Sequence, residues 1–220
     1  MSSIVTFTLI LALLAHPHET PTRPDRLWYR PSVDIPVTLV FGGVLAGLQL
    51  GNSSLAPKTC KWCDRAPDGS DALNGFDSWG RRNLKWNNTA NAALWSSVTA
   101  YAFAPAVAYG GDFLAAKHDG RPRDALDDAV LISQSWFAAS DVAQVIKLAT
   151  ARERPFIHVL PADQKSQAGE PSTNNESFPS GHAVLAFSLA TSSAEIASLR
   201  GYRYAPWLWG LGLPVASLTA

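Results

Sequence analysis

Two short segments of the sequence contain the residue types that a phosphate ester needs in order to be held and cleaved. The first begins at Lys147 and ends with Arg154 and Pro155, and the second is Pro-Ser-Gly-His at 179–182. Together they supply two permanent cations, a flexible turn and one imidazole. Each part alone has an ordinary structural explanation, because cations are common at helix C-termini and Ser-Gly is common in turns. Their combination at this spacing favours a phosphate site.

The spacing of the first segment predicts how its cations are presented. Residues seven apart on a helix return to nearly the same face, so Lys147 and Arg154 are expected to point into one pocket. Pro155 then ends the helix, since a residue before proline is pushed away from helical geometry. Arg154 would grip two phosphate oxygens with its planar fork, and Lys147 would act as a point charge.

The second segment is expected to open a helix over 183–190. Free backbone N–H groups at such a start bind anions, and Gly181 beside Ser180 would allow close approach of a phosphate. His182 follows directly. Its unperturbed pKa is near neutrality, which suits the donation of a proton to a leaving oxygen.

These residues resemble a known family. Lys-x6-Arg-Pro followed by Pro-Ser-Gly-His is similar to the first two signature motifs of the type 2 phosphatidic acid phosphatases. That superfamily also contains bacterial acid phosphatases and vanadium haloperoxidases. The resemblance covers roughly residues 85–220. It implies that Lys147, Arg154, Ser180 and Gly181 bind phosphate, that His182 is the general acid, and that no metal or other cofactor is needed.

The third motif of the family is missing from the sequence. That motif is Ser-Arg, five residues, His, three residues and Asp, and its histidine is the nucleophile that becomes phosphorylated. No Ser-Arg pair occurs here, and no histidine follows His182. Two interpretations stay open. The chain is a fragment of a longer phosphatase whose nucleophile lies beyond Ala220, or it is a short pseudo-enzyme that binds phosphorylated headgroups without turnover. A vanadate-dependent haloperoxidase is a third alternative, although those enzymes usually have a large soluble domain.

Composition and hydropathy predict an all-α membrane bundle. Apolar residues make up 47% of the chain and there are eight tryptophans, although the mean hydropathy is only +0.01. Segments that are nearly free of charge are long enough to cross a bilayer or to cover part of it. They are 36–50, 91–110, 129–146, 183–194 and 204–220. Their order agrees with the six-helix core that the resemblance implies, with the last helix absent from this chain.

Charge distribution predicts the partners and the orientation. Eighteen basic and eighteen acidic residues give no net charge, so the chain has no electrostatic footprint for nucleic acid. The short loop 111–124 carries Lys117, Arg121 and Arg123, and the positive-inside rule places it in the cytoplasm. The phosphate site would then face the periplasm from a bacterial inner membrane. The expected partners are the membrane and a phosphorylated lipid or small phosphoester.

The rest of the chain supplies less specific signals. Residues 1–35 are expected to form a signal-like or anchoring segment and a proline-rich linker, with the phosphatase-like domain at 36–220. Cys60 and Cys63 are expected to pair in a disulfide that staples a loop. Asp64, Asp68, Asp71 and Asp77 do not have the spacing of a calcium loop and are interpreted as solvated. The other histidines, at 16, 18, 118 and 158, are interpreted as surface residues.

Overall fold

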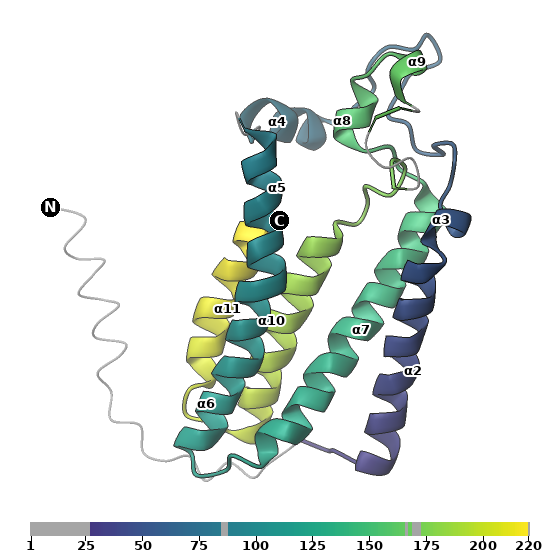
Figure 1. The fold of residues 1–220 in the computed structure, drawn as a ribbon. Coiled ribbons are helices and arrows are strands. Elements are labelled where there is room, and N and C mark those ends of the chain that lie inside the picture. The colour runs from purple at the N-terminus through teal and green to yellow at the C-terminus, as the bar shows by residue number, and fades with distance from the viewer. Residues whose placement is uncertain (1–26, 85–87, 166, 169–172, 220) are drawn as a thin grey trace, which may run out of the picture.

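The protein is an all-α bundle whose helices run alternately up and down (Figure 1). The computed structural model describes residues 27–84, 88–165, 167–168 and 173–219. The expected N-terminal segment, including the apolar run at 4–15 and the histidines at 16 and 18, lies outside the described residues. The all-α fold class is confirmed.

The long helices cross the bundle from end to end, and the short helices lie together at one of its ends (Figure 1). The long elements are α2 (Pro31–Leu50), α5 (Thr89–Val98) continued by α6 (Gly111–His118), α7 (Asp124–Thr150), α10 (Gly181–Arg200) and α11 (Ala205–Thr219). The short ones are α3 (Asn52–Leu55), α4 (Gly75–Asn83), α8 (Pro155–His158) and α9 (Ala162–Lys165). α10 packs against α7 and α11, and α2 packs against α7.

Helix α2 begins earlier than the sequence predicted. The linker was expected to reach residue 35, but the helix starts at Pro31 and includes Pro36. Proline is well tolerated at the first helical position because its missing N–H would have no partner there. The carboxylate of Asp34 reaches back and accepts a hydrogen bond from the Arg30 backbone N–H at 2.6 Å. This contact fixes the start of the helix inside the segment that was predicted to be extended.

The segment predicted as the cleanest membrane span, 91–110, lies within an unbroken helical run from 89 to 118. Two π-helical turns, Thr99–Phe103 and Ala106–Gly110, flank Pro105 in this run. Proline cannot donate the backbone hydrogen bond of a regular helical turn, and wider turns are one way for a helix to continue around it. The proline therefore changes the winding of the run without ending it.

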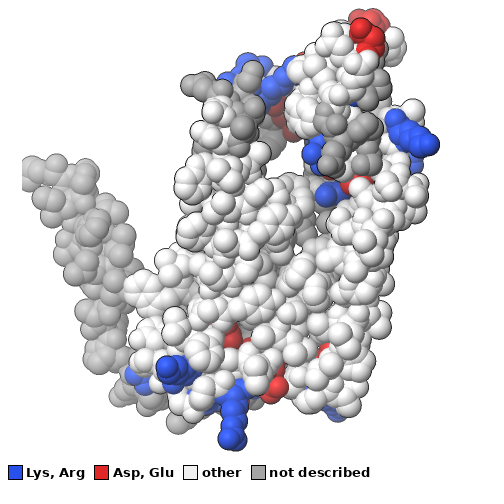
Figure 2. Space-filling view, in the orientation of Figure 1, with Lys and Arg blue, Asp and Glu red and all other residues white. Residues whose placement is uncertain are grey.

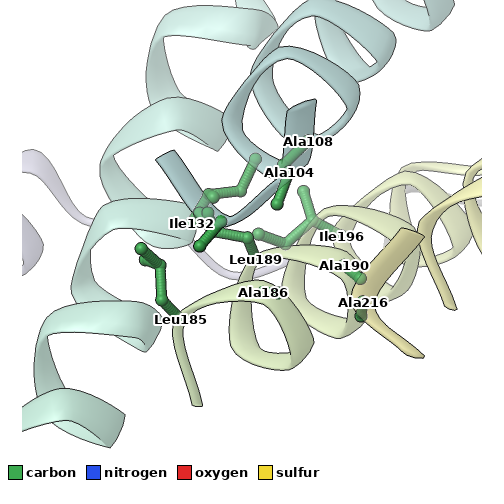
Figure 3. Close-up of a cluster of buried hydrophobic side chains, with 10 residues drawn as sticks. Ala104, Ala108, Ile132, Leu185, Ala186, Leu189, Ala190, Ile196 and Ala216 are labelled. Atoms are coloured by element: carbon green, nitrogen blue, oxygen red, sulfur yellow. The ribbon is translucent and has the colours of Figure 1, made fainter. Parts of the chain in front are cut away.

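The core of the bundle consists mainly of small side chains. Figure 3 shows alanines of α10 and of the run that contains Pro105 packed around Ile132 of α7 and Leu189 of α10. A methyl group added at Gly212 of α11 would lie 3.1 Å from the Cβ of Ala190 in α10. Small residues at a helix interface let the backbones approach closely, a pattern that is frequent in membrane bundles.

Charged side chains gather at the two ends of the bundle, and the middle of the visible face is almost free of them (Figure 2). Among the described helices, α2 and α7 are long and apolar enough to cross a membrane. Few residues of either helix are buried inside the protein. The other three predicted spans are helical but do not meet the same criterion of length and hydropathy within one α-helix.

Candidate functional site

A cavity of about 640 Å³ opens near the end of the bundle where α7 ends and α10 begins. All of the residues predicted to bind or protonate a phosphate ester line it: Lys147, Arg154, Ser180, Gly181 and His182. They come from the last turn of α7, the segment after it and the first turn of α10. The structure thus brings both sequence segments to one place.

Lys147 and Arg154 line one cavity for a structural reason that differs from the prediction. Helix α7 ends at Thr150, and Ala151 takes a left-handed conformation with φ of 46°. Arg154 therefore lies outside that helix, in extended conformation, immediately before Pro155 starts α8. The expectation that the two cations share a helix face is wrong. They line one cavity because the chain turns at Ala151 and brings Arg154 back beside the helix end.

The two segments approach each other closely at Gly181. A Cβ atom placed on it would lie 3.2 Å from the Lys147 Nζ. Ser180 caps α10, and its side-chain oxygen accepts a hydrogen bond from the Ala183 N–H at 3.3 Å. The ammonium group thus lies against the helix start, where backbone N–H groups have no partner within the helix. This arrangement of a cation and free amides suits an anion.

The imidazole of His182 is held from behind by a residue that the sequence did not single out. Ser96 Oγ lies 2.8 Å from His182 Nδ1 and donates to the Thr219 carbonyl at 3.3 Å. A hydroxyl has one hydrogen, so while it donates to Thr219 it must accept from Nδ1–H. In this arrangement Nδ1 carries the proton, and we therefore predict the Nδ1–H tautomer for the ligand-free site; in either tautomer Nε2 is the nitrogen left for a ligand. The ring also meets Tyr101 edge-on, with ring centroids 5.2 Å apart.

The surroundings of His182 disfavour its charged form. Burial lowers the pKa of His182, and the positive charges of Lys147 and Arg154 lower it further. A phosphate dianion placed between these groups would reverse the electrostatic part of this effect. Proton uptake by His182 is therefore expected to accompany phosphate binding.

The segment that carries Arg154 is held by a disulfide-closed loop. Cys60 and Cys63 are joined by a disulfide bond. The backbone N–H of Lys61 donates to the Ala151 carbonyl at 3.1 Å, and the N–H of Glu153 donates to the Trp62 carbonyl at 3.2 Å. This short backbone pairing fixes the extended chain that leads from α7 to Arg154.

Arg152 strengthens the same contact between the two segments. Its guanidinium lies 4.5 Å from the centre of the Trp62 ring and is paired with Asp64 at 2.9 Å and Asp77 at 2.5 Å. Asp64 and Asp77 were expected to be solvated loop residues. They are instead structural partners of the arginine two residues before Arg154.

His158 was interpreted as a surface residue, and this is wrong. It is buried, ends the short helix α8, and contacts Glu153 through Nδ1 at 3.2 Å and Asp71 through Nε2 at 2.8 Å. Because both ring nitrogens are engaged, His158 joins loops and does not line the cavity. His118 is partly exposed and lies next to Asp119, at the opposite end of the bundle. Among the described residues, no group of three or more His, Cys, Asp or Glu side chains could hold a metal ion.

Several residues in or behind the cavity could not have been found from the motifs. Tyr101 lines the cavity and Ser96 contacts His182 from behind, and both belong to the helical run before α7. Glu176 lines the cavity from the loop before α10. The sequence around Ser96 and Tyr101 indicates only an apolar helix, and Glu176 has the pattern of an ordinary acidic residue in a loop. A polar residue within an apolar helix is the one signal that could have pointed to Ser96.

Comparison with known families agrees with the geometry. Residues 129–220 match the model of the PAP2 superfamily. The matched part contains both motifs, most of helix α7, and helices α10 and α11, and the match is consistent with the type 2 phosphatidic acid phosphatase superfamily. No curated protein and no solved structure gives a significant match to the chain. The match supports a role within a family of phosphatases.

Proposed function

We propose that this protein is the phosphate-binding part of a phosphatase that hydrolyses a phosphomonoester or pyrophosphate, in particular one carried by a lipid. The observation that carries the proposal is the contact between Lys147 Nζ and the helix start at Gly181, in the cavity that Arg154 and His182 also line. The two cations and the backbone amides would bind the phosphoryl oxygens. They would also offset the charge that develops during transfer, so the scheme needs no metal.

His182 would protonate the leaving oxygen. Ser96 holds Nδ1, so the proton that is transferred comes from Nε2 of the imidazolium form. This form is disfavoured in the ligand-free site by burial and by the neighbouring cations, which lower the pKa of His182. A bound phosphate would restore it. The acid would thus be charged when a substrate is present.

The attacking group would come from a residue outside the described chain. In the family this is the histidine of the third motif, which the sequence lacks. The Thr219 carbonyl already touches Ser96, which in turn holds His182. Residues that follow Thr219 in a longer chain would therefore begin beside the proposed proton donor. Without such a residue, the protein would bind phosphate and release it unchanged.

A membrane location accompanies this proposal. Two apolar helices and the charge-free middle of the bundle suit a bilayer, and the cavity lies toward one charged end (Figure 2). A phosphate group carried by a lipid is found at the same level, where the hydrocarbon gives way to water. We place the site on the periplasmic side of a bacterial inner membrane, on the basis of the positively charged loop at the other end.

The purified 220-residue chain tests the binding part of the proposal. We expect it to bind inorganic phosphate or vanadate, measured by titration calorimetry, and to release no phosphate from phosphatidate or p-nitrophenyl phosphate. Lys147→Ala should weaken phosphate binding at least about tenfold, because it removes a charge-assisted contact. Lys117→Ala, an exposed lysine at the opposite end, is the matched control. Equal affinity in the native chain and Lys147→Ala would refute the proposed site.

A longer form that carries the third motif tests the proton donor. His182→Ala should reduce kcat on alkyl phosphates by roughly 10²–10⁴-fold and affect p-nitrophenyl phosphate much less. A good leaving group needs little protonation, so only the poor one depends on the acid. An equal loss on both substrates would mean that His182 acts in another way.

A further inference from the structure

Helix α4 presents its aromatic side chains outward and its polar side chains toward the protein, which is the reverse of the pattern expected for a helix in water. Phe76 is 78% exposed and Trp79 is 48% exposed, and their rings stack with centroids 6.2 Å apart. Asp77 and Ser78, which lie between them in the sequence, are half-buried. The outward face of α4 therefore suits an apolar phase outside the protein.

Asp77 fixes which face of α4 is turned to the protein. Its carboxylate pairs with Arg152 at 2.5 Å and accepts a hydrogen bond from Asn74 Nδ2 at 2.6 Å. Its backbone N–H donates to the Asn74 side chain at 2.9 Å, which caps the start of the helix. The Arg152 side chain is only 15% exposed, so this pair joins α4 firmly to the segment that ends at Arg154. The outward orientation of the aromatic face is thus imposed by the fold.

The place of α4 in the fold identifies the apolar phase as a lipid bilayer. α4 ends at Asn83, and α5 begins shortly afterwards at Thr89. Figure 1 shows α4 at the end of the bundle where α5 starts, with its axis across that of α5. The middle of the visible face is almost free of charge, and lysine and arginine side chains gather at the end that carries α4 (Figure 2). α4 therefore lies at the level where the apolar surface of the bundle gives way to a charged one.

The last turn of α4 supplies cations. Arg81 and Arg82 are exposed there. Arg81 pairs with Asp71 at 2.7 Å, whereas Arg82 donates to Ser78 Oγ at 2.5 Å and has no carboxylate partner within the described part of the chain. Helices with aromatic residues on one face and arginines on the other lie in the plane of the membrane interface, where tryptophan is enriched. Lipid phosphates are suitable partners for a guanidinium at this level.

We infer that α4 is an interfacial helix whose Phe76 and Trp79 enter the boundary between lipid headgroups and acyl chains, with its two arginines at the level of the lipid phosphates. This inference rests on the membrane location in the proposed function and adds a contact surface to it. The pair made by Asp77 joins α4 to the segment that carries Arg154. The contact with the bilayer therefore sets the level of the phosphate site relative to the headgroups.

Site-directed spin labelling of the full chain in phosphatidylcholine vesicles tests the inference. The chain has two cysteines, which are bonded to each other, so an introduced cysteine is the only free thiol. Nitroxides at Phe76→Cys and Trp79→Cys, labelled in separate proteins, should be reached more readily by oxygen, which concentrates in the bilayer, than by a water-soluble nickel complex. The ratio of the two accessibilities should be several times higher than at Ser70→Cys, an exposed loop position that is the matched control.

A label at Leu39→Cys separates this inference from the membrane location on which it rests. Leu39 is 70% exposed in the middle of α2, so its label should be the most accessible to oxygen if the bundle crosses a bilayer. A label at 39 in lipid together with labels at 76 and 79 in water would overturn the inference and leave the location standing. A label at 39 in water would overturn both. Labels at 76 and 79 that neither reagent reaches would show a protein partner on α4, and the inference would be wrong. Phosphate titration, which tests the cavity, does not enter this measurement.

Discussion

Replacement of Gly181 by alanine should weaken phosphate binding without destabilising the fold. The glycine is exposed at the first position of α10, and its φ is not in the left-handed region. Alanine fits this backbone, and it is favoured over glycine in helices by up to about 1 kcal/mol. The one neighbour that the new methyl group meets is Lys147 Nζ, at 3.2 Å. The substitution therefore perturbs the contact between the cation and the helix start and little else.

The size of the effect follows from this distance. Ordinary contacts of a Cβ lie at 3.4–4 Å, so the ammonium must move by a few tenths of an ångström. For an ammonium and a phosphate dianion, a shift from about 3.0 to about 3.5 Å at an effective dielectric constant of about 20 costs about 1.6 kcal/mol. This energy corresponds to an increase of roughly ten- to twentyfold in the Kd for phosphate.

Calorimetric titration of phosphate and thermal unfolding should be measured together on the same preparations. Gly181→Ala should raise the Kd roughly ten- to twentyfold and leave the midpoint of unfolding unchanged or higher. Gly210→Ala is the matched control, since a methyl group there meets no atom within 4 Å, and it should leave the Kd unchanged. The reasoning is refuted if Gly181→Ala binds phosphate as tightly as the native chain while Lys147→Ala does not bind it.

Three further perturbations address the groups around the phosphate site. Ser96→Ala should release His182 from its Nδ1–H tautomer, and the chemical shifts of the imidazole nitrogens should report the change. Ser135→Ala, at an exposed serine of α7, should leave these shifts unchanged. An Nε2–H tautomer in the native protein would contradict the assignment. Because the pKa of His182 is lowered in the folded state, unfolding free energy should fall as pH drops below about 6.5. His182→Ala should reduce this fall, and an unchanged pH profile would exclude a contribution of His182. Replacing Cys60 and Cys63 together by serine should cost at most about 2 kcal/mol of stability, because the disulfide closes a very short loop. The same replacement should weaken phosphate binding. Unchanged affinity would mean that the disulfide-closed loop does not position Arg154.

The sequence predicted the course of the chain better than the limits of its helices. Apolar segments separated by polar loops gave the right order of helices and placed both motifs at one end. The start of α2 at Pro31 was missed because proline was treated as a linker residue, although it is well suited to a first helical turn. The helical run through Pro105 depends on wider turns that no local pattern announces.

The phosphate site was predicted in its residues but not in its geometry. Lys147 and Arg154 were assigned to one helix face from their spacing alone, whereas a left-handed residue at 151 ends the helix between them. Alanine disfavours the left-handed conformation, so the residue type at position 151 does not indicate the turn. Glu176 and Ser96 gain their meaning from partners 32 and 86 residues away. Spacing within a motif cannot reveal such partners.

The Cys-Lys-Trp-Cys loop at 60–63 has no proposed chemical role, but it supports the segment that carries Arg154. In the sequence it is separated from Arg154 by about ninety residues, and it suggested only a staple within its own loop. In the fold its backbone pairs with residues 151–153, and Trp62 lies against Arg152. On its other side the same extended segment is held by the loop before α10, because the Arg154 N–H donates to the Asn174 carbonyl at 2.8 Å and the Ser177 N–H donates to the Arg152 carbonyl at 3.1 Å. The disulfide-closed loop and the loop before α10 thus share the positioning of Arg154 that the sequence had assigned to a continuous helix.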